Sequence, residues 1–257
     1  MMTIPLLLQI VKGASPTEAG LLMIPMTIGM MTASMGSGVI TGRTGKYKMF
    51  LIGGTAFLTV GYLYLAQMDY QWAMWKISIG MVILGLGLGQ LMQTLMVAAQ
   101  NAVEPRDIGV ATSSSTFFRQ MGGTAGVAIF LSILFTELAN KGTWIATQIA
   151  STIKANPALM SLPENAVLKD AGPGGLSAMV NSDSSFLQTI SSEIARPILI
   201  AFTESGVAVF RAAAVVTFIG LLLSFFVREI PLRMQSGVAA KAEAEAAESD
   251  IALSSMH

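Results

Sequence analysis

The sequence contains no cysteine, and its one histidine is the last residue, His257. Without thiols the chain can form no disulfide framework, no thiol nucleophile and no cysteine-based metal site. No apolar stretch carries a constellation of histidine, cysteine or paired carboxylates that would supply a nucleophile, a base and an acid. We therefore expect neither an enzyme nor a bound metal or cofactor.

Charge is also scarce, since Asp, Glu, Lys and Arg make up 12% of the residues against about 25% in an average soluble domain. The 15 basic and 15 acidic residues cancel, and the basic ones lie in short separated stretches, so nucleic acid is not an expected partner. What is abundant is apolar: 53% of the residues are hydrophobic. Several windows reach the length of about 20 mostly apolar residues that crosses a bilayer. The composition predicts an all-α, polytopic bundle of transmembrane helices in a lipid bilayer.

The expected bundle occupies residues 1–230. A capping box, with Ser15 at the N-cap and Glu18 at the third helical position, marks the first full helix. The apolar run before it covers only half a bilayer, so we interpret it as the last part of a helix whose beginning is missing. The helices are expected at 1–11 (partial), 16–40, 49–67, 76–99, 108–135 and 206–227.

Two long segments lack this pattern. The segment 137–205 is rich in residues typical of turns and loops, in the stretches Asn-Pro, Leu-Pro-Glu, Gly-Pro-Gly-Gly and Asn-Ser-Asp-Ser-Ser. These stretches predict a long extracytoplasmic loop. The alanine- and glutamate-rich tail, 231–257, is expected to be a solvated helix or disordered, in the cytoplasm.

The positive-inside rule orients the chain. If five full crossings follow Lys12, the basic residues between 41 and 48, Arg106, and the two arginines after the last helix share one side. That side is expected to be the cytoplasm. Lys12, the turn with Trp72 and Trp75, and the 137–205 loop then lie on the opposite side.

Arg119 is a charged residue in the middle of a helix that is otherwise expected to be apolar and buried. Eleven residues after Ile108, at 1.5 Å per residue, it lies roughly 16 Å into the helix, close to the bilayer midplane. Facing lipid there costs about 2.5–3.5 kcal/mol, so the side chain should face protein or a wet cavity. Either it ties helices together through carbonyls or a carboxylate, or it lines a substrate cavity. Small and polar residues share its face: Thr112, Ser115, Thr116, Gly122, Gly123 and Gly126.

A second polar stripe runs along 76–99, where glutamines recur at helical spacing. Interhelical hydrogen bonding and substrate lining explain them equally well. The candidates for a substrate cavity are Gln90, Gln93, Arg119 and Gln120. The 18 methionines suggest either core and lipid-facing filler, which is favoured, or a cavity lining that adapts its shape.

The glycines of the GLGLG stretch do not form a nucleotide-binding loop, because the spacing is not GxGxxG and the stretch lies inside an apolar span. Gly85 and Gly89 instead form a GxxxG packing face. The residues expected at helix contacts are Gly85, Gly89, Gly122, Gly123 and Gly126.

These stretches together resemble a known family. LLLQIVKGASPTEAGLLMIP, GVITGRTGKYK, GLGLGQLMQT with AAQNAV, GVATSSSTFFRQMGGTAGVAIF and FVREIPLR are similar to the C-terminal half of fourteen-helix drug:proton antiporters of the major facilitator superfamily, the EmrB/QacA type. The resemblance covers nearly all of the chain except 137–205 and the tail.

The resemblance implies a fold and a function. Two six-helix halves surround a midplane site, and their rocking gives alternating access. It implies proton-driven efflux of hydrophobic, often cationic small molecules from a bacterial inner membrane. The chain would be inactive without an N-terminal half, which would hold the carboxylates linked to proton coupling.

The resemblance also assigns a cytoplasmic gate loop. Its residues here are Gly38, Arg43, Gly45, Lys46 and Lys48. The usual acidic residue of this loop is replaced by Gly42, so Arg43 needs a partner elsewhere. An alternative to transport is a membrane adaptor or scaffold that acts through the 137–205 loop.

Overall fold

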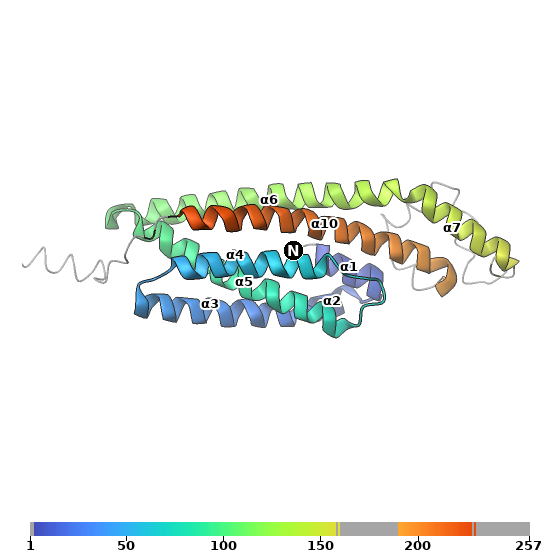
Figure 1. Ribbon diagram of the computed structural model, residues 1–257, viewed down its shortest axis with the longest axis horizontal. Helices are drawn as coiled ribbons and strands as arrows, with labels where there is room; N and C mark the ends of the chain where they lie inside the picture. Colours follow the sequence, from blue (N-terminus) through green and yellow to red (C-terminus); the bar gives the residue numbers. More distant parts are fainter. Residues whose placement is uncertain (1–2, 158, 160–189, 228, 230–257) are drawn as a thin grey trace, which may run out of the picture.

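A computed structural model of the chain describes residues 3–157, 159, 190–227 and 229. Its helices run side by side in an elongated bundle (Figure 1). They are α1 (Thr3–Lys12), α2 (Pro16–Leu22), α3 (Ile24–Thr44), α4 (Lys48–Leu65), α5 (Met74–Asn101), a short 3-10 helix η1 (Pro105–Asp107), α6 (Ile108–Asn140), α7 (Gly142–Ala155) and α10 (Ser192–Phe226).

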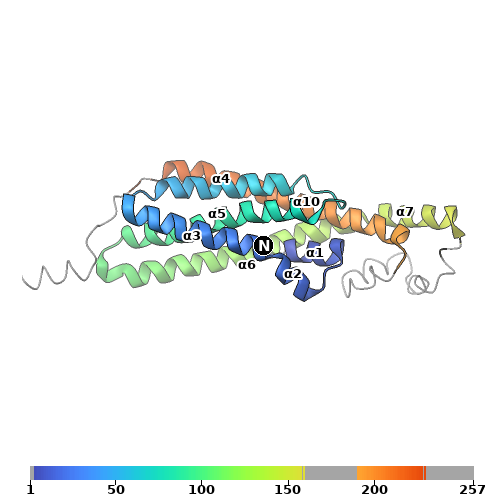
Figure 2. The same cartoon turned by 90° about the horizontal axis from the view of Figure 1, so that it is seen from below.

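Five stretches among the described residues are long and apolar enough to cross a membrane: Pro16–Thr44, Lys48–Leu65, Met74–Asn101, Pro105–Asn140 and Ser192–Phe226. The expectation of an all-helical membrane bundle is confirmed. The helix α5 packs against both α3 and α4, while α10 packs against α4, α6 and α1. The view from below shows α5 between α3 and α4 (Figure 2).

The first span begins as the sequence predicts but is divided in two. Ser15 accepts a hydrogen bond from the Glu18 N–H (3.2 Å), and Glu18 accepts one from the Ser15 N–H (2.8 Å), which confirms the capping box. The helix is interrupted at Met23, just before Pro25. Proline has no N–H to continue the helical ladder, so α3 starts anew with Pro25 in its first turn.

The end of this span also differs from the prediction, because α3 continues to Thr44 rather than 40. Gly45 then ends the helix in the left-handed region at φ 71°, and its N–H donates to the Thr41 oxygen (2.8 Å). A glycine adopts this conformation without the strain that a side chain brings. The short basic loop is therefore reduced to 45–47, and Arg43 lies on the last helical turn.

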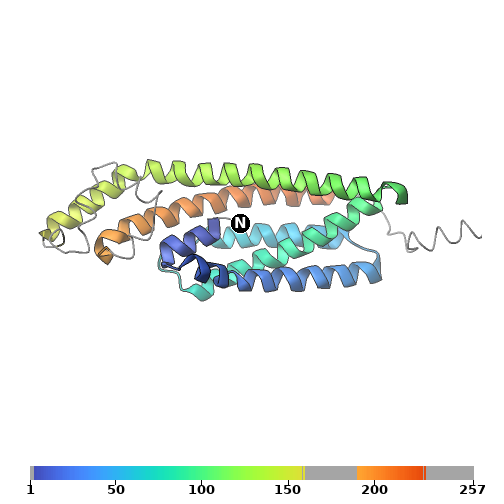
Figure 3. The same cartoon turned by 180° about the vertical axis from the view of Figure 1, so that it is seen from behind.

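The prediction of one loop over 137–205 requires correction in its described parts. α6 reaches Asn140, α7 follows at once, and α10 starts at Ser192 rather than at 206. Together they extend beyond the rest of the bundle at one end (Figure 3). The Leu-Pro-Glu, Gly-Pro-Gly-Gly and Asn-Ser-Asp-Ser-Ser stretches lie outside the described residues, as does the tail 231–257.

The core is concentrated where α1, α4, α5 and α10 meet. Fully buried side chains from these helices include Leu8, Leu65, Leu84 and Phe202. Gly206 of α10 admits α1 closely, since a Cβ there would come 2.8 Å from Leu7. This packing joins α1 and α10 in one core.

The turn between α4 and α5 is attached to its surroundings by cations. Lys12 donates from Nζ to the backbone oxygens of Tyr70 (2.8 Å) and Trp72 (2.7 Å). Lys76 lies 5.8 Å from the ring centre of Trp72, and Arg196 lies 5.8 Å from that of Tyr70. These contacts are of cation–π type. They occur at the end of the bundle that the sequence assigns to the extracytoplasmic side.

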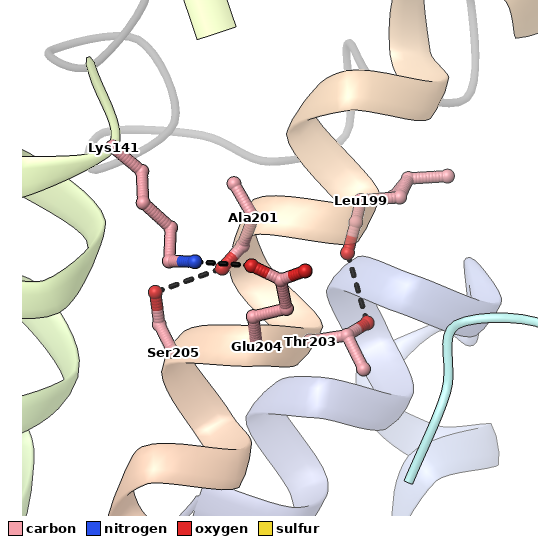
Figure 4. A network of polar contacts seen from close by, with 6 residues as sticks. All are labelled: Lys141, Leu199, Ala201, Thr203, Glu204 and Ser205. Carbon is pink, nitrogen blue, oxygen red and sulfur yellow. Dashed lines mark hydrogen bonds and ion pairs between the residues drawn. The ribbon is translucent and has the colours of Figure 1, made fainter. Parts of the chain in front are cut away.

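An ion pair connects α10 to the junction of α6 and α7 (Figure 4). Lys141, at that junction, donates to a Glu204 carboxylate oxygen. The neighbouring hydroxyls of Thr203 and Ser205 donate to the backbone oxygens of Leu199 and Ala201, both at 2.8 Å.

We expect this pair to contribute little to stability, because the Glu204 side chain is 56% exposed and exposed ion pairs give about 0.2–1 kcal/mol. A double-mutant cycle of Lys141→Met and Glu204→Gln, followed by denaturant unfolding in detergent, measures the coupling. A coupling above about 2 kcal/mol would contradict this expectation.

Candidate substrate groove

A groove of about 390 Å³ lies between α3, α5 and α6. The helix α3 contributes three methionines and a serine, α5 contributes two methionines, a glycine and a glutamine, and α6 contributes one arginine. The lining residues are Met30, Met31, Ser34, Met35, Gly89, Met92, Gln93, Met96 and Arg119. Its size is within the range of small-molecule sites.

Helical spacing explains why the methionines converge. Met31 and Met35 are four residues apart on α3, and Met92 and Met96 are four apart on α5, so each pair shares one face of its helix. Met side chains are flexible and polarizable, and they adapt to apolar molecules of different shape. The structure thus brings five methionines together, although the sequence favoured a filler role.

Arg119 enters the groove from α6. Its side chain forms no ion pair within the described part of the chain, and it is the one ionisable residue of the groove lining. The predicted alternatives for this residue were a tie between helices and a cavity lining. Its position in the groove is what the cavity hypothesis requires.

The predicted glutamines separate in the structure. Gln93 lines the groove and lies against Gly38 of α3, where a Cβ would be 3.5 Å from the Gln93 Cγ. Gln90 instead faces α4, with its Oε1 3.0 Å from a Cβ placed on Gly53. Gln120 is exposed on α6 and is not among the groove residues. Of the four predicted cavity residues, the structure brings Gln93 and Arg119 together.

The packing glycines also divide into two groups. A Cβ on Gly85 would come 2.2 Å from the Met26 oxygen, and one on Gly89 would come 2.2 Å from the Met30 oxygen. The backbones of α3 and α5 are therefore in direct contact there, and Met30 and Gly89 of this contact also line the groove. Gly122 and Gly123 have nothing within 4 Å of such a Cβ, and Gly126 has only Phe130 at 3.9 Å. These three leave their side of α6 without a packing partner in the described structure.

The predicted gate residues have mixed surroundings. Lys48 donates from Nζ to the Phe225 oxygen (2.9 Å) and so ties the start of α4 to the end of α10. Arg43 and Lys46 are exposed, and no ion pair within the described ranges includes either of them. The gate role stays a prediction.

Sequence reasoning missed a second cavity, of about 970 Å³, at the other end of the bundle. Its residues come from α7, the start of α10 and the turn after α4, and include Tyr70, Trp144, Glu193 and Arg196. It was not predicted because 137–205 was interpreted as a loop, although α7 and the start of α10 lie in this range. The aromatic and charged residues at 144, 193 and 196 were the available signal.

Comparison with known proteins agrees with this architecture. The Major Facilitator Superfamily matches residues 1–127, which contain every residue of the groove. An uncharacterized MFS-type transporter of Mycobacterium tuberculosis is 36% identical over 229 residues, 89% of this chain. The chain is thus similar to major facilitator superfamily transporters over most of its length. It is thus a multi-pass membrane protein, and its bacterial relatives agree with the expected inner-membrane location.

Two further relatives of the chain have descriptive names. A tetracycline resistance determinant of Streptomyces rimosus is 29% identical over 89% of the chain, and the multidrug transporter protein MdtP of Bacillus subtilis is 29% identical over 89% of it. The matches span 30% of the Mycobacterium relative, 66% of the Streptomyces protein and 42% of the Bacillus protein. No solved structure matches the chain.

Proposed function

We propose that this chain forms one helical bundle of an alternating-access transporter that exports amphipathic small molecules. The observation that carries the proposal is the groove between α3, α5 and α6, which combines an adaptable methionine lining with one amide and one guanidinium. Membrane transporters bind substrates near the midplane, at the interface between repeated halves. The names of the Streptomyces and Bacillus relatives support export of drug-like compounds.

Transport on this proposal requires a second bundle, which covers the open side of the groove. Arg119, Gly122 and Gly123 are exposed on α6, and small residues with no neighbour are suited to close helix contact. The relatives also extend well beyond the matched region. The second bundle is the N-terminal half that the sequence resemblance implies.

The proposed energy source is the proton gradient. The groove has no acidic lining residue, and the sequence resemblance implies that the carboxylates for proton coupling lie in the second bundle. The adaptor hypothesis is not favoured, because the relatives over 89% of the chain are transporters.

The test is export in a bacterial strain that lacks its own efflux pumps. We expect the chain alone to leave the accumulation of a fluorescent amphipathic dye unchanged. Coexpression with the N-terminal helices of the Mycobacterium relative is expected to lower accumulation several-fold, and a protonophore is expected to reverse the effect.

Membrane levels of both pieces, and their copurification, are the controls. Efflux by the chain alone would contradict the need for a second bundle. Persistent efflux under a protonophore would contradict proton coupling. No efflux from a copurifying pair, with any of a panel of anionic, neutral and cationic dyes, would contradict transport.

A further inference from the structure

The charge in and around the groove has one sign. Arg119 is the one ionisable group of its lining. The helices α3 and α5 contain no aspartate or glutamate along their whole length, and α6 contains only Glu137. Glu137 lies roughly 27 Å from Arg119 along α6, at 1.5 Å per residue. The three walls therefore offer Arg119 no nearby counter-charge.

A positive group in this setting selects against cations. In a low-dielectric site, the repulsion between Arg119 and a bound cation is much stronger than in water. An anion instead gains a charge-assisted hydrogen bond, and a guanidinium matches the two oxygens of a carboxylate in a bidentate pair. Electrostatics thus distinguishes between ligands that share the same apolar body.

The rest of the lining fits an apolar, planar body. Five methionines surround the space, and thioether sulfur makes favourable contacts with aromatic rings. Gln93, held beside Gly38, adds one amide that can donate to or accept from a polar substituent. The volume of about 390 Å³ admits a fused-ring molecule of moderate size.

We propose that the groove selects amphipathic organic anions, with the acidic group paired to Arg119 and the apolar body against the methionines. The proposal rests on the transport function above and adds the charge class of the substrate. It differs from the cationic compounds that the family resemblance implies.

The experiment measures binding without transport. The purified chain is placed in nanodiscs of zwitterionic lipid and titrated against three probes that share a pyrene body: 1-pyrenebutyrate, its neutral amide, and the matching trimethylammonium cation. Fluorescence anisotropy is corrected with empty nanodiscs. We expect the anion to bind at least tenfold more tightly than the amide or the cation.

Variants separate the charge from the apolar surface. Arg119→Gln is expected to lower affinity for the anion at least tenfold and to leave affinity for the amide unchanged, while Arg119→Lys retains part of the preference. Arg106→Gln, which removes an exposed arginine in η1 outside the groove, is the matched control and should change nothing. Met92→Ala combined with Met96→Ala should weaken all three probes to a similar degree.

Three results with the chain alone would overturn the proposal: equal affinity for the three probes, a preference for the cation, or no effect of Arg119→Gln. A preference that disappears when the second bundle is added would also overturn it, because Arg119 would then pair with a carboxylate of that bundle. The two proposals fail separately. Dye export without anion preference rejects only the substrate class, and anion binding without export rejects only transport.

Discussion

Replacing Gly85 and Gly89 with alanine is expected to destabilise the bundle more than any other change of a single methyl group per site. A Cβ at either position would come 2.2 Å from a backbone oxygen of α3, and no side-chain rotamer change can relieve a contact with backbone. The two helices would have to move apart along their contact. Overpacking of this kind costs about 1–3 kcal/mol or more per site, so we expect the double variant to lose about 3 kcal/mol or more.

The matched control is the same substitution at Gly122 and Gly123, where nothing lies within 4 Å of the added Cβ. Alanine is a better helix former than glycine by about 0.5–1 kcal/mol, so this pair should be neutral or slightly stabilising. Denaturant unfolding in detergent and the amount of folded chain in membranes measure both pairs. Equal effects of the two pairs would show that α3 and α5 do not make this contact.

The two glycine pairs also show what sequence alone can predict. Both lie on small-residue faces, and both were expected to pack. A face of small residues indicates that a close contact is possible, but the partner can come from the same chain or from another one. The spacing contains no information on that choice. Only the three-dimensional arrangement separates the contacts of Gly85 and Gly89 from the open surface at Gly122, Gly123 and Gly126.

The start of α10 was predicted wrongly for a different reason. The turn and loop stretches of the sequence end at 185, but the predicted loop was continued to 205. The structure buries Ile194, Ile198 and Phe202, which recur every four residues on one helical face. This periodicity was visible in the sequence. Packing against the core outweighs the cost of the internal proline, whose interruption affects only one turn.

The candidate site was predicted in part. A charge in an apolar helix is rare enough to single out Arg119. Gln90 and Gln93 were placed on one face, because residues three apart are neighbours on a helix. They are still about 60° apart around the axis at 100° per residue, and α5 lies between α3 and α4. That angle directs Gln90 toward α4 and Gln93 toward α3, which no pattern within α5 could predict.

The second large effect is expected at Lys12, whose Nζ donates to two backbone oxygens of the turn between α4 and α5. Lys12→Met keeps the length and apolar character of the side chain but removes both hydrogen bonds. Hydrogen bonds from a charged donor contribute about 1.5–3 kcal/mol each. Since the lysine is only half-buried and water can replace part of the loss, we expect a total of about 2–4 kcal/mol.

The loss should be local, because the two carbonyls belong to one turn. Hydrogen exchange in nanodiscs is expected to rise in residues 66–73 and to stay unchanged in the turn between α3 and α4, at the opposite end. Lys46→Met removes the same charge from that opposite end, where the lysine side chain is exposed, and should alter neither turn. Lys12→Arg keeps the donors and should retain much of the protection. Uniform loss of protection in both turns would instead mean that Lys12 stabilises the bundle as a whole, through its contact with the core shared by α1 and α10.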